Sequence, residues 1–103
     1  MRFLLKVEYP VEAANAKARD GSLAQTIQAI LDVQKPEAAY FLTSDGKRAG
    51  FIFVNLDDAS EIPAYAEPWF LALNAKVEFI PAMNAQDLMK AGPAIEQAVK
   101  QFG

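Results

Sequence analysis

The amino-acid sequence predicts a single α+β domain over residues 1–103, and three observations lead to this fold class. Strand and helix patterns follow one another in the order strand, helix, strand, strand, helix, strand, helix. An Asp-Gly pair at 45–46 joins the two middle strands, and this pair is a strong signal for a tight hairpin. The chain has 103 residues, which is long enough for one hydrophobic core but too short for two.

The first two predicted elements are a strand over Arg2–Tyr9 and a helix over Val11–Gln34. Apolar residues alternate with others along the strand, and Pro10 ends it because proline cannot donate to a sheet ladder. Apolar residues then recur at helical spacing toward the end of the second segment. The alanines before Gly21 favour one continuous helix, although Ser22 could begin a second helix as a capping box with Gln25.

The two middle strands are predicted over Glu37–Ser44 and Arg48–Asn55, on either side of the hairpin turn. The second of them contains four consecutive apolar residues, Phe51–Val54. Both faces of that strand should therefore be covered, which favours a central position in the sheet.

The second helix is predicted to start at Asp58, because Glu61 follows three residues later as in a capping box. Pro68 lies inside this helix and has no amide hydrogen, so we expect a kink or a restart there. The fourth strand follows over Lys76–Pro81.

A last helical segment is predicted to start at Asn84 with Asp87, which form another cap signature. Gly92-Pro93 should interrupt the segment before it resumes toward the end of the sequence.

This βαββαβ order with an extra C-terminal helix predicts a ferredoxin-like fold, with an antiparallel sheet of order 4-1-3-2. The predicted helix-covered face holds Phe3, Leu5, Val7, Phe51 or its neighbours, Val77 and Phe79. The predicted open face holds Leu4, Lys6, Glu8, Tyr40, Leu42, Ile52, Val54, Glu78 and Ile80. Because so apolar a face is unfavourable in water, we expect a homodimer with two sheets packed face to face.

In element order, and in the closing phrase Val77-Glu78-Phe79-Ile80-Pro81-Ala82-Met83, the chain resembles the dimeric α/β-barrel superfamily. That superfamily includes muconolactone isomerase, cofactor-independent quinone-forming monooxygenases and many small proteins of unknown function. The resemblance implies the fold and the dimer. Enzymes of the superfamily often use a histidine in the barrel, and this sequence contains none.

Composition excludes several classes of function. Charged residues of both signs are scattered along the chain, with a net charge of −3, so no basic stripe is present for nucleic acid. No apolar stretch approaches the length of a membrane span, and we expect a cytoplasmic protein. The chain has no Cys and no His, and we predict neither a metal site nor a cofactor.

Four charged residues form the most interesting pattern: Lys6, Glu8, Lys76 and Glu78. By alternation all four project to the open face, on neighbouring strands. In a partly closed barrel, Glu78 or Glu8 could act as a general base, with Lys6 and Lys76 contacting a ligand. The alternative is two cross-strand Glu–Lys pairs that stabilise the sheet near its edge or fix the register of the dimer.

Three aromatic residues are candidates to contact a ligand: Tyr9, Tyr40 and Trp69. Each tyrosine hydroxyl needs a partner if it is buried, and Tyr40 falls on the open face. Trp69 could line a cavity for a flat aromatic molecule, or it could simply belong to the core, since its spacing matches the apolar face of its helix.

The sequence leaves three functions open. The first is a protein that binds a small apolar or aromatic molecule in a cavity between sheet and helices, without a cofactor. The second is a cofactor-independent isomerase or monooxygenase that uses a Glu base. The third is a structural or interaction module whose assembly is its function. No catalytic set is complete, so whether the protein is an enzyme stays undecided.

Overall fold

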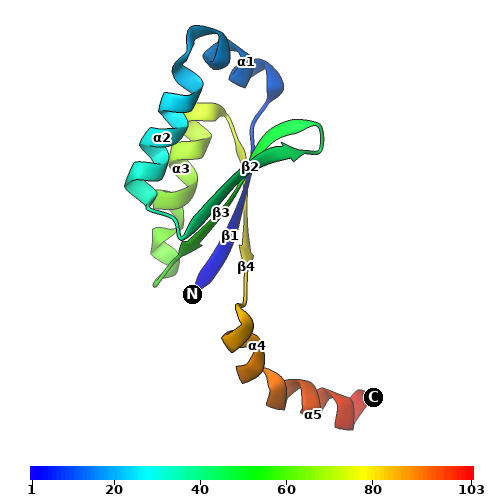
Figure 1. Ribbon diagram of the computed structural model, residues 1–103. Coiled ribbons are helices and arrows are strands. Elements are labelled where there is room, and N and C mark those ends of the chain that lie inside the picture. The colour runs from blue at the N-terminus through cyan, green and yellow to red at the C-terminus, as the bar shows by residue number, and fades with distance from the viewer.

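The computed structural model describes residues 1–103 and shows a four-stranded sheet, one short 3₁₀ segment and five helices (Figure 1). In chain order these are β1 (Arg2–Glu8), α1 (Val11–Asp20), α2 (Ser22–Gln34), β2 (Ala38–Ser44), β3 (Lys47–Asn55), η1 (Ala59–Glu61), α3 (Ile62–Leu73), β4 (Lys76–Pro81), α4 (Ala85–Lys90) and α5 (Gly92–Phe102).

The sheet is antiparallel throughout, in the order β2-β3-β1-β4. This is the predicted 4-1-3-2 order read from the opposite edge, so the predicted fold class is confirmed. The turn between β2 and β3 consists of Asp45 and Gly46, whose φ angles are 55° and 74°. Both angles are positive, as a two-residue type I′ hairpin requires.

Helices α2 and α3 lie on one face of the sheet, α1 lies beyond one end of the strands, and no helix covers the opposite face (Figure 1). The core fills the layer between sheet and helices, with Leu5 of β1, Ile52 of β3 and Trp69 of α3 fully buried. At the edge of this layer the rings of Phe3 and Phe79 meet edge to face, with their centres 6.0 Å apart. The predicted core positions on β1 and β4 are therefore confirmed.

The prediction of one continuous helix over residues 11–34 is wrong, because the chain breaks at Gly21. Gly21 adopts a left-handed conformation with φ 82°, and its amide caps the end of α1 by donating to the carbonyls of Ala18 and Lys17. Such a conformation is easy only for glycine. The Ser22 amide donates to Asp20 Oδ1 at 2.8 Å, and no side chain caps the start of α2. The capping box of Ser22 with Gln25 is therefore absent, although α2 does restart at Ser22.

The second predicted helix start is confirmed, because Asp58 and Glu61 form a capping box at η1. The Asp58 amide donates to Glu61 Oε2 at 2.8 Å. Helix α3 follows directly and runs without interruption through Pro68. The alternative of a restart at Pro68 is therefore wrong.

The predicted facing of β3 is also wrong. Leu5 pairs with Ile52 and Lys6 pairs with Phe51 in the β1–β3 ladder. Directly opposed residues share a face, so Ile52 and Val54 point to the helices, and Phe51 and Phe53 point to the open face. All four residues are apolar, so alternation could not reveal which pair faces inward.

The last two helices, α4 and α5, leave the sheet at the end of β4 and project away from the other elements (Figure 1). Asn84 and Asp87 form the predicted capping box at α4, and Gly92-Pro93 begins α5. The predicted start and interruption of this segment are confirmed. None of the helices combines the length and the apolar character needed to span a bilayer.

Candidate functional site

The open face of the sheet is the most distinctive surface of the molecule. It combines apolar and aromatic side chains with the four charged residues singled out in the sequence. By the register of the ladders it holds Leu4, Lys6 and Glu8 of β1, Lys76, Glu78 and Ile80 of β4, Ala49, Phe51 and Phe53 of β3, and Ala38, Tyr40 and Leu42 of β2. With Phe51 and Phe53 here instead of Ile52 and Val54, this face is more aromatic than predicted.

The four predicted charges do meet on this face. Lys6 lies directly opposite Glu78, and Glu8 lies directly opposite Lys76, in the β1–β4 ladder. The ion pairs, however, run along each strand: Lys6 Nζ lies 3.3 Å from Glu8 Oε1, and Lys76 Nζ lies 3.5 Å from Glu78 Oε1. Two mutually opposed Lys–Glu pairs thus form one neutral patch on the face.

Glu8 differs from Glu78 in its burial. Only 8% of Glu8 is exposed, while 45% of the Glu78 side chain on the edge strand β4 is exposed. A buried carboxylate needs a partner, and the Lys6 ammonium provides it. Of the two predicted general bases, Glu8 is the more buried and desolvated, and Glu78 is the more exposed to water.

The three aromatic candidates lie in different places. Tyr40 is on the open face as expected, at the outer strand β2, and 64% of it is exposed. Tyr9 directly follows β1 and is buried in the core cluster that also contains Ala14 and Val7. Burial raises the pKa of the Tyr9 hydroxyl, and the positive charge of Arg48 partly opposes this increase.

Trp69 lies wholly within the core, with no exposed surface. Its indole N–H donates to Gln34 Oε1 at 3.2 Å. The Gln34 amide in turn donates to the carbonyl of Tyr65 at 2.9 Å. This buried network joins α2 to α3, and it places Trp69 among the structural residues, away from the open face.

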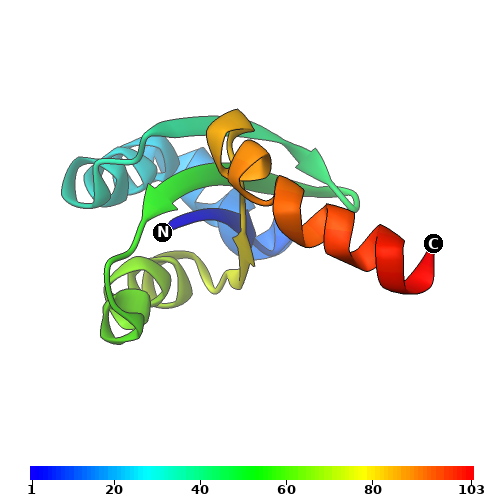
Figure 2. The ribbon, with the colours of Figure 1, turned by 90° about the horizontal axis from the view of Figure 1, so that it is seen from below.

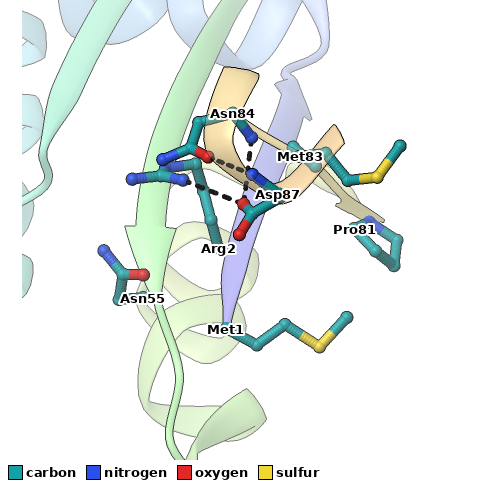
Figure 3. A pocket seen from close by; sticks show the side chains of 8 residues that line it. Met1, Arg2, Asn55, Pro81, Met83, Asn84 and Asp87 are labelled. Carbon is teal, nitrogen blue, oxygen red and sulfur yellow. Dashed lines mark hydrogen bonds and ion pairs between the residues drawn. The ribbon is translucent and has the colours of Figure 1, made fainter. Parts of the chain in front are cut away.

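A hollow of about 590 Å³ lies at the junction of the sheet and α4 (Figure 3). Its lining comprises Met1, Arg2, Asn55, Pro81, Ala82, Met83, Asn84 and Asp87. None of these was predicted as a site residue. Arg2 was recognised only as a position on a strand, and the Asn84/Asp87 pair only as a helix cap.

Arg2 is the central charge of this hollow. Its Nε and Nη2 atoms each donate to the Glu37 carboxylate at 2.8 Å, and its Nη1 atom lies 3.7 Å from Asp87 Oδ2. These hydrogen bonds lower the pKa of Glu37 and raise that of Arg2. Because Arg2 is already paired with two carboxylates, its guanidinium is not free to bind an anionic ligand.

A second hollow of about 210 Å³ is more apolar and lies between the start of β1 and the start of α3. It is lined by Met1, Phe3, Leu56, Asp57, Asp58, Ala59 and Ile62. Neither hollow involves Tyr40, Trp69 or the four predicted charges. The chain also contains no group of three or more acidic side chains that could hold a metal ion.

Comparison with known proteins finds a family match along almost the whole chain. Residues 1–96 match the family described as "Domain of unknown function (DUF3303)". This chain belongs to that family. The match covers every element except the end of α5, including the open face and the hollow at α4.

The chain is also similar to the Xenopus laevis protein named 1-phosphatidylinositol 4,5-bisphosphate phosphodiesterase delta-4. The two are 31% identical over 71 residues, which is 69% of this DUF3303 chain. The matched segment is only 9% of the length of the Xenopus protein. A likeness to so small a part of that protein gives no ground for assigning its activity here.

Proposed function

We propose that this DUF3303 protein is a homodimer that binds a small apolar or aromatic molecule against the open face of its sheet. One observation carries the proposal: an uncovered sheet face rich in aromatic residues surrounds a buried carboxylate, Glu8. A large apolar face without a cover is unusual for a monomer and is typical of an interaction site. The resemblance to the dimeric α/β-barrel superfamily supports the same arrangement.

The open face supports the proposal better than the helix-covered face, because the core occupies the centre of the layer between sheet and helices. The sequence pattern predicts a cavity between sheet and helices. Leu5, Ile52 and Trp69 are fully buried at the centre of that layer, and the apolar hollow at its edge, beside Phe3 and Ile62, measures only about 210 Å³. Two sheets packed face to face lie about 10 Å apart, and side chains from both normally fill the gap. A ligand would occupy the part of the gap where the side chains leave space.

The chemistry of the face indicates what would bind. Tyr40, Phe51 and Phe53 offer aromatic surface, which favours a flat apolar molecule. The Lys6–Glu8 ion pair adds one polar group of side chains on the neighbouring strand β1, which a ligand could hydrogen-bond. A neutral ring that carries a hydroxyl or carbonyl group fits this combination better than a strongly charged ligand does.

An enzymatic role is a second candidate, and the burial of Glu8 favours it. Glu8 lies on the proposed ligand face with a Lys6 ammonium at 3.3 Å, so it could accept a proton from a bound molecule. In this case Glu8→Gln abolishes turnover while the dimer and ligand affinity persist. Glu78→Gln, at the exposed edge, serves as the matched control.

The test is native mass spectrometry of the protein purified without added ligand. We expect a dimer that carries extra mass, and gentle activation should release this mass as a small molecule. The substitution Phe53→Ser on the open face should weaken the dimer and abolish the extra mass. The control is Leu71→Ser, which changes an exposed apolar residue of α3 on the helix side and should leave both unchanged.

Each other outcome has a definite meaning. A monomer at all concentrations contradicts the whole proposal. A dimer without extra mass, which also binds no member of a library of aromatic alcohols and ketones, leaves the interaction module as the better description. If a released molecule is converted by the unmodified protein but not by Glu8→Gln, the enzymatic role is supported.

A further inference from the structure

The C-terminal arm, α4 and α5, is not packed on its own chain. Neither helix contains a buried residue. The chain has a radius of gyration of 17.0 Å and a longest extent of 59 Å. A compact chain of this length would have a radius of about 13 Å. The arm therefore accounts for the elongated shape. In a monomer, this shape leaves the arm without packing contacts to the rest of the chain.

Helix α5 carries an apolar stripe that nothing covers. Ile95, Val99 and Phe102 follow one another at spacings of four and three residues, which places them on one side of the helix. All three are exposed, and Phe102 is 82% exposed. An isolated helix of 11 residues is only marginally stable in water, so α5 needs a surface to pack against.

The arm is nevertheless held in a defined direction. At its base the Asp87 amide donates to Asn84 Oδ1 at 2.8 Å, and the Asn84 amide donates to Asp87 Oδ2 at 3.0 Å. Arg2 of β1 lies against Asp87 and connects α4 to the sheet (Figure 3). The carbonyl of Ala91 accepts from Ala94 and Ile95, so α5 continues from α4 without a flexible linker.

That direction lies on the same side of the sheet as the open face. Helices α2 and α3 lie on one side of the sheet, while α5 extends beyond the opposite side (Figures 1 and 2). With 11 residues, α5 is about 16 Å long. A second sheet stacked on the open face would lie about 10 Å away. The helix is therefore long enough to pass the edge of that second sheet.

We infer that the arm of each chain clasps the second copy in the dimer. This inference rests on the proposed homodimer and adds the partner of a second surface. A single two-fold axis would cover both unpartnered surfaces of each chain at once, the sheet face and the α5 stripe. The two Lys and two Glu side chains of β1 and β4 on that face balance each other, so these four residues add no like-charge repulsion between two stacked faces.

A cross-linking experiment tests the inference directly. The chain has no cysteine, so Val99→Cys introduces a unique thiol on the stripe, to which a photoactivated cross-linker can be attached. The modified protein is mixed with unmodified, nitrogen-15-labelled chain and then irradiated. We expect a covalent product of mixed mass. Gln97→Cys, on the opposite side of α5, is the matched control and should give much less of it.

Sedimentation equilibrium gives a second readout. Val99→Glu should raise the dimer Kd about tenfold or more, because it places a charge in an apolar contact. Gln97→Glu adds the same charge outside the stripe and should change the Kd less than about threefold.

The failures of the two proposals can be told apart. A dimer whose Kd is unaffected by Val99→Glu, with cross-links only within one chain, overturns the clasp and leaves the dimer intact. A monomer under all conditions overturns both. Mixed-mass product together with the raised Kd supports both.

Discussion

Two adjacent residues of β3 provide the sharpest test of how this molecule is built. Phe51 and Ile52 are both apolar and lie next to each other, yet the register assigns them to opposite faces of the sheet. The perturbation is the matched pair of substitutions Phe51→Ala and Ile52→Ala. Both remove a large side chain from the same strand, so differences in strand propensity largely cancel.

The expected magnitudes differ because the surroundings differ. Ile52 is 0% exposed and packs in the core that contains its ladder partner Leu5. Truncating such an isoleucine to alanine costs about 2–5 kcal/mol of unfolding free energy. In a domain of about 100 residues each kcal/mol shifts the Tm by about 4–8 °C, so we expect a drop of at least about 8 °C. Phe51 faces the uncovered side, and its truncation should cost the single chain less than about 1 kcal/mol.

Urea unfolding at two protein concentrations about a hundredfold apart separates the effects, because dimer stability depends on concentration and monomer stability does not. Ile52→Ala should lower the midpoint by a similar amount at both concentrations. Phe51→Ala should lower it mainly at the high concentration, where the unmodified chain is dimeric. Sedimentation should show a weakened dimer only for Phe51→Ala.

The reasoning is refuted if the two variants behave alike. If Phe51→Ala lowers stability as much as Ile52→Ala at low concentration, Phe51 belongs to the core and the assigned facing of β3 is wrong. If Phe51→Ala leaves both the midpoint and the Kd unchanged at high concentration, the open face is not the dimer interface.

Three further changes have definite expected results. Gln34→Leu leaves the buried indole N–H of the single tryptophan without an acceptor and should lower the free energy of unfolding by about 1–3 kcal/mol, measured by urea titration; an unchanged value would mean that this hydrogen bond is dispensable. Gly21→Ala forces a residue with a β-carbon to keep a φ of 82° and should cost about 1 kcal/mol, while a gain in thermal stability would show that the break can straighten. Arg2→Gln should destabilise the protein above the ordinary Glu37 pKa of 4.5, because a pKa that is lowered on folding adds stability that is lost as the pH falls through the folded-state value. The difference from the unmodified chain should therefore shrink in acid, and a difference that is constant with pH would contradict the role of this ion pair.

The local signals in the sequence were strong wherever one or two residues decide a conformation. Asp45-Gly46 predicted the hairpin, and the cap pairs Asp58/Glu61 and Asn84/Asp87 predicted the starts of η1 and α4. The same logic applies at Gly21, although the alanines before it favour a continuous helix. The glycine decides the conformation there, because in its left-handed conformation its amide donates to the carbonyls at the end of α1.

The facing of β3 could also have been derived from the sequence. A two-residue turn at Asp45-Gly46 pairs Tyr40 with Phe51, and paired residues share a face. Placing Tyr40 on the open face therefore requires Phe51 there as well. The composition of β3 concealed this, because its apolar residues are consecutive and carry no alternation.

What the sequence by itself determined is the order of the elements, the topology of the sheet and the presence of four charges on one face. These follow from short-range chemistry: periodicity, caps and the two backbone angles of one turn. Tertiary structure alone decided that the ion pairs run along the strands, that Trp69 is held by Gln34, and that Arg2 joins β1 to α4. It also decided that α5 extends beyond the open face (Figure 2). Each of these depends on distances between residues far apart in the chain, which a pattern of neighbours along the sequence does not encode.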